Sequence, residues 1–128
     1  MPLLMYIAAG LATATLLVHT IAGSRVVVAP LLASRSLSPA SRWLNYYCWH
    51  LTTLLIAFVG CGFVWLAAAP MTEDRTSVLI ALCCLTTASG LWSIAVARMG
   101  RIHPFRFPST SLFLGTSVVG WAAVWAGT

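Results

Sequence analysis

Apolar residues dominate this chain in four long runs that are separated by three short polar stretches. The runs cover about residues 3–23, 43–69, 76–97 and 109–127, and a helix needs roughly 20 apolar residues to cross a bilayer. Almost no sequence is left over for a soluble domain. The pattern therefore predicts one membrane domain over residues 1–128, an all-α, polytopic four-transmembrane-helix bundle.

The first apolar run continues beyond Gly23 through a second apolar stretch that contains Pro30. A single helix over residues 3–33 would be roughly 45 Å long, well beyond a hydrocarbon layer of about 30 Å. We therefore expect the helix to break or leave the membrane between Gly23 and Pro30. Capping residues predict that the three later helices start at Ser38 or Pro39, at Thr72 or Asp74, and at Ser109.

Small and polar residues recur at helical spacing in the last three runs, which predicts the faces that pack inside the bundle. In the second run these are Tyr46, His50, Thr53, Ala57, Gly60, Cys61 and Val64. In the third they are Cys83, Thr87, Gly90, Ser93 or Ile94, and Ala97. In the fourth they are Ser109, Phe113, Thr116, Gly120, Ala123 and Gly127.

Composition and charge predict the environment of these runs and their orientation in the membrane. Hydrophobic residues make up 60% of the chain and charged residues 7%, which excludes a soluble domain with a solvated surface. The net charge of +5 comes from seven arginines without a lysine, six of them in the first and third polar stretches. Because basic loops stay in the cytoplasm, both termini are predicted to be extracytoplasmic, in a bacterial inner (plasma) membrane. Arginines that flank membrane spans predict contact with lipid and not with nucleic acid.

Cysteines and an apolar N-terminal run often indicate a secreted or processed protein, but in this chain they have another interpretation. The four cysteines, Cys48, Cys61, Cys83 and Cys84, fall inside the apolar runs and are predicted to be free apolar residues without disulfides. The N-terminal run lacks a basic start and a clear cleavage site, so we expect it to be a retained first span. Aromatic residues fit the predicted membrane boundaries, with Trp43, Tyr46 and Tyr47 at the inner end of the second span and Trp65 at its outer end.

Three histidines carry the candidate chemistry. His19, His50 and His103 all fall in the predicted cytoplasmic half, as does Arg25, and ionisable groups inside a span usually face the bundle interior or water. The four residues are predicted to line a ligand-binding cavity. Imidazole suits transition metals, so the three histidines are also candidate metal ligands, and two of them are candidate haem ligands. The alternative is structural, in which the imidazoles only form hydrogen bonds between helices.

Short sequence elements are similar to those of a group of small, uncharacterised bacterial membrane proteins with four spans. These elements are Gly23-Ser24-Arg25 followed by Pro30-Leu31-Leu32, then Trp49-His50, then His103-Pro104. In that group an acid often precedes the arginine, whereas this chain has Ser24. The resemblance implies the four-span fold and the importance of Arg25, His50 and His103, and it implies no activity.

Three functions remain open from the sequence. The first is binding or transport of a small ligand in the cavity lined by His19, Arg25, His50 and His103. The second is a non-catalytic accessory or scaffold subunit of a membrane complex. The third is a membrane oxidoreductase that binds haem or a transition metal, so the sequence leaves open whether the protein is an enzyme. The expected partners are the lipid bilayer and either further copies of the chain or a larger complex, because so small a bundle encloses little volume.

Overall fold

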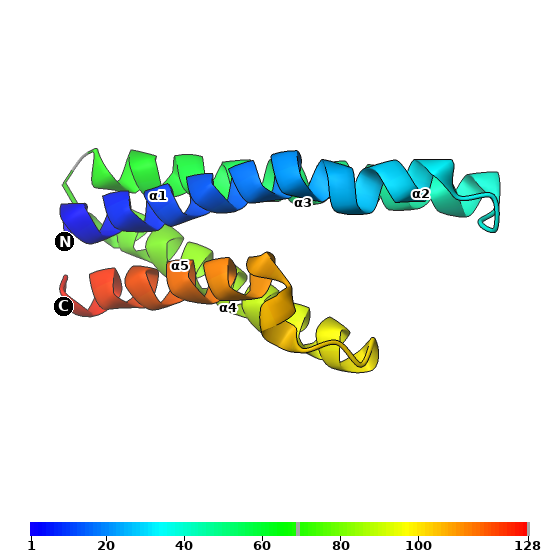
Figure 1. Cartoon of the computed structure of the whole chain (residues 1–128). Coiled ribbons are helices and arrows are strands. Elements are labelled where there is room, and N and C mark those ends of the chain that lie inside the picture. Colours follow the sequence, from blue (N-terminus) through cyan, green and yellow to red (C-terminus); the bar gives the residue numbers. More distant parts are fainter. Residues whose placement is uncertain (69, 128) are drawn as a thin grey trace.

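The computed structural model describes residues 1–68 and 70–127, and this part of the chain is helical and without strands. Four long helical stretches follow one another (Figure 1). The elements are α1 (Pro2–Leu17), η1 (Val18–Ala22), η2 (Ser24–Val28), α2 (Ala29–Ala33), α3 (Pro39–Ala67), α4 (Glu73–Met99), η3 (Pro104–Arg106) and α5 (Pro108–Trp125).

The first helix does not break where the sequence predicted a break. From Pro2 to Ala33 the chain is one continuous helix, and Gly23 has ordinary helical dihedral angles (φ −64°, ψ −34°). The helix widens instead into π-helical turns, in which Gly23 donates to the carbonyl of Val18 and Ala29 to that of Ser24. These wider turns directly precede Pro30, the residue that lacks an N–H group for the helix. The expected interruption is thus replaced by a local change in hydrogen bonding.

The starts of the later helices agree with the capping residues. The Ser38 hydroxyl accepts a hydrogen bond from the Ser41 N–H (3.2 Å), and the Thr72 hydroxyl accepts one from the Arg75 N–H (3.4 Å). The last helix begins at Pro108, one residue before the expected Ser109. The predicted end of the second span, Ala69, lies outside the described residues.

Three helical stretches are long and apolar enough to cross a membrane: Pro2–Ala33, α3 and α4. α5 is not among them. Large apolar side chains also cover the outside of the molecule, among them Phe58 (65% exposed), Trp92 (67%) and Val118 (68%). Exposure of so much apolar surface to water is unfavourable, whereas exposure to lipid is not. The helices and their surface are therefore those of a membrane protein.

The first helix pairs with α3, α4 pairs with α5, and the two pairs are joined by the packing of α1 on α5. α1 packs along both α3 and α5, and α4 packs along α5, whereas α3 and α4 touch over a short stretch beside the turn that joins them. The shared core lies in this half and includes Met5, Phe63, Leu79, Cys83 and Ala123. Both chain termini and the α3–α4 turn lie at this end, and the two other loops point away from it (Figure 1). We call it the terminal end and the other end the loop end.

The predicted inward faces are confirmed for two of the three helices. Cys83, Gly90 and Ala97 of α4 are buried, as are Phe113, Thr116, Gly120 and Ala123 of α5. The prediction for α3 is largely wrong. His50, Cys61 and Val64 are exposed, and the buried residues of that helix are instead Ile56, Val59, Phe63, Leu66 and Ala67.

Candidate functional site

His19 lies in the π-helical segment η1 and contacts α3 directly. Its imidazole stacks on the indole of Trp49, with ring centroids 3.8 Å apart and an interplanar angle of 14°. The His19 Nε2 atom also lies 3.3 Å from the Trp49 carbonyl oxygen, which accepts a hydrogen bond from the Thr53 hydroxyl as well. When this nitrogen donates to the carbonyl, His19 links the first helix to α3 by a hydrogen bond as well as by ring stacking.

The close contact depends on Gly23, one turn after His19. A Cβ atom at position 23 would overlap the ring of Trp49. Only glycine therefore lets the indole lie against the first helix and leaves it free to stack on His19. Gly23 and Trp49 both belong to the short sequence elements named above, but the sequence analysis chose polar side chains as functional candidates and did not predict this contact.

His50 follows Trp49 on α3 but points elsewhere. Consecutive residues on a helix project about 100° apart, and the side chain of His50 is exposed while that of Trp49 is half-buried. The imidazole meets the ring of Tyr46 edge-on, with centroids 4.5 Å apart and an interplanar angle of 83°. Tyr46 in turn meets Trp43 in the same manner at 5.7 Å. His50 thus belongs to an aromatic row on the outside of α3.

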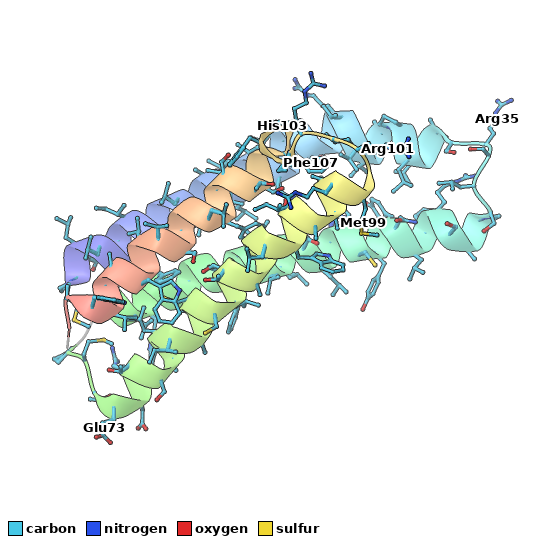
Figure 2. All side chains as sticks on the ribbon, turned by 90° about the horizontal axis from the view of Figure 1, so that it is seen from below. Arg35, Glu73, Met99, Arg101, His103 and Phe107 are labelled. Atoms are coloured by element: carbon cyan, nitrogen blue, oxygen red, sulfur yellow. The ribbon has the colours of Figure 1, made fainter. Side chains whose placement is uncertain are left out.

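The remaining predicted residues do not join this contact. His103 is exposed on the loop between α4 and α5, where its nearest ring is that of Phe105 at 5.8 Å (Figure 2). Arg25 is exposed in η2. Across residues 1–68 and 70–127, the structure brings no three His, Cys, Asp or Glu side chains close enough to share a metal ion. The predicted set of three histidine ligands is therefore not assembled in the described structure.

Comparison with protein-family models, curated proteins and solved structures finds no match. The similarity to small bacterial four-span proteins accordingly stays a prediction. What can be inferred about function depends on the residues of this chain alone.

Two surface grooves of the described structure have no histidine among their lining residues. One of 350 Å³ runs between α1 and α3 and is lined by apolar and small residues, including Ala12, Ala57, Gly60 and Cys61. A wider one lies on α5 beside Val118 and Ala122. Three of the four residues named on the first groove, Ala57, Gly60 and Cys61, belong to the α3 stripe that was predicted to pack inside. The stripe instead borders an open, lipid-facing depression.

The strongest polar contacts join α4 to α5 and were not predicted as pairs. The hydroxyls of Thr87 and Ser117 lie 2.6 Å apart, and the Trp121 Nε1 atom donates to Thr87 at 3.1 Å. Nearer the loop end, the hydroxyls of Ser93 and Thr110 also lie 2.6 Å apart. The helical spacing of Ser and Thr residues in α4 and α5 could have predicted these hydrogen bonds, and the structure shows that the hydroxyls bond across the interface.

Proposed function

We propose that the chain crosses a bacterial inner membrane four times, with α5 as the fourth crossing. The support comes from the orientation of the polar residues of α5. Thr110, Thr116 and Ser117 are all buried, and Thr110 and Ser117 bond to hydroxyls of α4. Val118 and Trp125, by contrast, are 68% and 78% exposed. α5 has 18 residues, which gives about 27 Å of helix for a hydrocarbon layer of about 30 Å.

The charge distribution supports an orientation with both termini extracytoplasmic. Six arginines lie towards the loop end of the molecule. Both acids of the chain, Glu73 and Asp74, lie beside Arg75 at the terminal end. The guanidinium of Arg75 stacks 4.3 Å from the ring of Trp65, as expected of an anchor at the outer boundary. The loop end is then the cytoplasmic side.

Within this topology, we propose that the protein is a non-catalytic subunit of a membrane assembly. The observation that carries the proposal is the engagement of His19, the one predicted site histidine that is half-buried between two helices. Its ring face is covered by Trp49 and its Nε2 atom pairs with a backbone carbonyl. Such an imidazole holds helices together. The aromatic row of Trp43, Tyr46 and His50 then remains on the outside of α3 as a surface for a neighbouring protein.

Two substitutions test this function. His19→Ala is expected to lower the thermal unfolding midpoint of the protein in mild detergent, because it removes a ring stack and a hydrogen bond worth about 1–2 kcal/mol together. His50→Ala is expected to leave that midpoint nearly unchanged and to reduce the share of protein that migrates in a larger assembly, as measured by light scattering after size-exclusion chromatography. A wild-type protein that migrates as a lone chain would contradict the proposal.

A second candidate, binding of a small ligand or metal, is favoured by one observation. His50 is exposed and makes no hydrogen bond within the described residues, so its nitrogens are available. The probes are Zn²⁺, inorganic phosphate and ferric haem, each titrated into purified protein by calorimetry and absorption spectroscopy. Stoichiometric binding that His50→Ala abolishes, in a variant with normal unfolding, would support this candidate over the assembly subunit. Bound haem would in addition favour an oxidoreductase.

A further inference from the structure

The first helix and α3 extend much further towards the loop end than α4 and α5 do. The continuous helix Pro2–Ala33 has 32 residues and α3 has 29, or about 48 Å and 44 Å of helix, against 18 residues in α5. α4 has 27 residues but runs obliquely to the first helix and α3, so that it ends before them (Figure 1). Figure 1 shows α2 and the start of α3 reaching well past the loop that follows α4. We call residues 24–44, at the end of this pair, the projecting hairpin. Arg35 marks its tip (Figure 2).

Tilting cannot bring the projecting hairpin into the hydrocarbon layer. This holds for the four crossings and the orientation proposed above. To fit 48 Å of helix into 30 Å, the first helix would have to tilt by about 50°, whereas membrane helices tilt by up to about 40°. α5 is too short to tilt far, and α1 packs antiparallel along it, with Leu11 beside Gly115 and Met1 beside Gly127. Both helices therefore stand close to upright, and the projecting hairpin extends about 15 Å beyond the inner hydrocarbon boundary.

The surface of the projecting hairpin is unusually apolar for a segment outside the hydrocarbon. Val28, Leu31 and Leu37 are partly buried within it. On its outside, Val26 is 75% exposed and Leu44 is 61% exposed. Val27, Leu32 and Trp43 add to this exposed apolar surface. Exposed apolar surface of this kind marks an interaction site.

Charge indicates what covers this surface. The hairpin carries Arg25, Arg35 and Arg42 and no acid, and both acids of the chain lie at the opposite end of the molecule. A second copy would bring its own three arginines against these three, which is unfavourable. Lipid headgroups add about 5–8 Å to each side of the hydrocarbon, so they reach only the first half of a 15 Å projection. Leu32 and Arg35 lie in the second half.

We propose that the projecting hairpin is the docking site for a partner protein on the cytoplasmic side, with an apolar groove bordered by carboxylates. The groove takes the exposed side chains around Leu32, and the carboxylates pair with Arg35 and its neighbours. This inference rests on the assembly function proposed above and adds a cytoplasmic partner contact to the aromatic row of α3. The complementary charges steer the two surfaces together, and the apolar centre provides most of the binding free energy.

Site-specific photocrosslinking in living cells of the bacterium that produces the protein tests the docking site. The full-length chain carries benzoylphenylalanine at Leu32 (36% exposed) or, as a control, at Val118 (68% exposed), an apolar position in the middle of α5 that is the more exposed of the two. We expect a discrete protein adduct from position 32 and none from position 118, with the crosslinked peptide of the partner containing Asp or Glu. Arg35→Glu is expected to reduce the adduct at least fivefold, and Arg75→Glu at the opposite end is expected to leave it unchanged.

Several outcomes would overturn the docking site. They are an adduct with the mass of two copies of this chain, adducts with lipid only, and a protein adduct that Arg35→Glu does not weaken. Both Leu32 and Arg35 lie on the outside of the hairpin, so the amount of protein in the membrane serves as the folding control. If the wild-type protein still migrates in a large assembly while position 32 gives no adduct, only the docking site is wrong. If the wild-type protein migrates alone, the assembly function fails as well.

Discussion

At the scale of single residues, the contact between the first helix and α3 depends on Gly23. Gly23→Ala places a methyl group on the Trp49 ring and forces the indole out of its stack with His19. We expect the change to destabilise the protein by about 1–3 kcal/mol, as overpacking usually does. Thermal unfolding in detergent measures it.

Gly10→Ala is the matched control for this substitution. A Cβ atom at position 10, also in the first helix, meets nothing within 4 Å, and alanine is the better helix former by up to about 1 kcal/mol. The control is therefore expected to unfold at the same or a higher temperature. Equal behaviour of the two variants would show that the Trp49 contact does not constrain position 23.

Arg101 offers a second residue-scale prediction, based on its backbone conformation. It follows the end of α4 with a φ of 55°, in the left-handed region where glycine is favoured, and the Ile102 N–H there bonds to the Ala97 carbonyl (2.8 Å). Arg101→Gly is expected to raise stability by about 1 kcal/mol, because it relieves the crowding of Cβ. Arg98→Gly, inside the helix, should lower stability by a similar amount. If Arg101→Gly also destabilises the protein, the guanidinium itself must hold this loop.

The partnership of His19 with Trp49 could not be predicted from the sequence for a physical reason. Helical spacing shows which residues of one helix share a face, but the rotation of that helix against its neighbours is set by the packing of all of them. The charge pattern predicts that all three histidines lie in the cytoplasmic half, which stays a prediction. Their rings nevertheless have different surroundings: an indole stack for His19, an exposed aromatic row for His50 and a loop for His103.

At the scale of helices, the sequence predicted inward faces well where hydroxyl groups needed partners. Thr87 was predicted to face inward and lies against Ser117 of α5, a residue outside the predicted face of that helix. α3 lacks such a row in its terminal half. Because lipid and protein core are both apolar, Ile56 and Phe63 inside the bundle look no different in sequence from Leu54 and Phe58 on its surface.

Thr87→Val tests the bond between α4 and α5. The substitution keeps the side-chain shape and removes the hydroxyl that contacts both Ser117 and Trp121. We expect a loss of about 1 kcal/mol, the usual value for hydrogen bonds between membrane helices, measured by unfolding in detergent. Thr13→Val is the control, because the exposed Thr13 donates only to the Ala9 carbonyl of its own helix. The interhelical bond is not stabilising if both variants unfold alike.

At the scale of the whole molecule, the proposed number of crossings depends on whether α5 crosses the membrane. By length and hydropathy, three helical stretches of the described residues could cross a membrane, and the 18-residue α5 is not among them. Ser117 and Thr110, however, bond to hydroxyls of α4, and Thr116 donates to the Leu112 carbonyl of its own helix. A helix with internally satisfied polar groups and an apolar outer face can cross a bilayer, whereas its sequence average counts both faces equally.

The side of the C-terminus decides between three and four crossings. In a background with the four native cysteines replaced, single cysteines at Thr72, Ser36 and Ala126 are treated with a maleimide that cannot cross membranes. With four crossings, the cysteines at positions 72 and 126 react in cells whose inner membrane is accessible from outside, and the one at position 36 reacts only after permeabilisation. If α5 stayed on the cytoplasmic side, position 126 would behave like position 36. That result would also remove the upright α5 on which the projection of the hairpin depends.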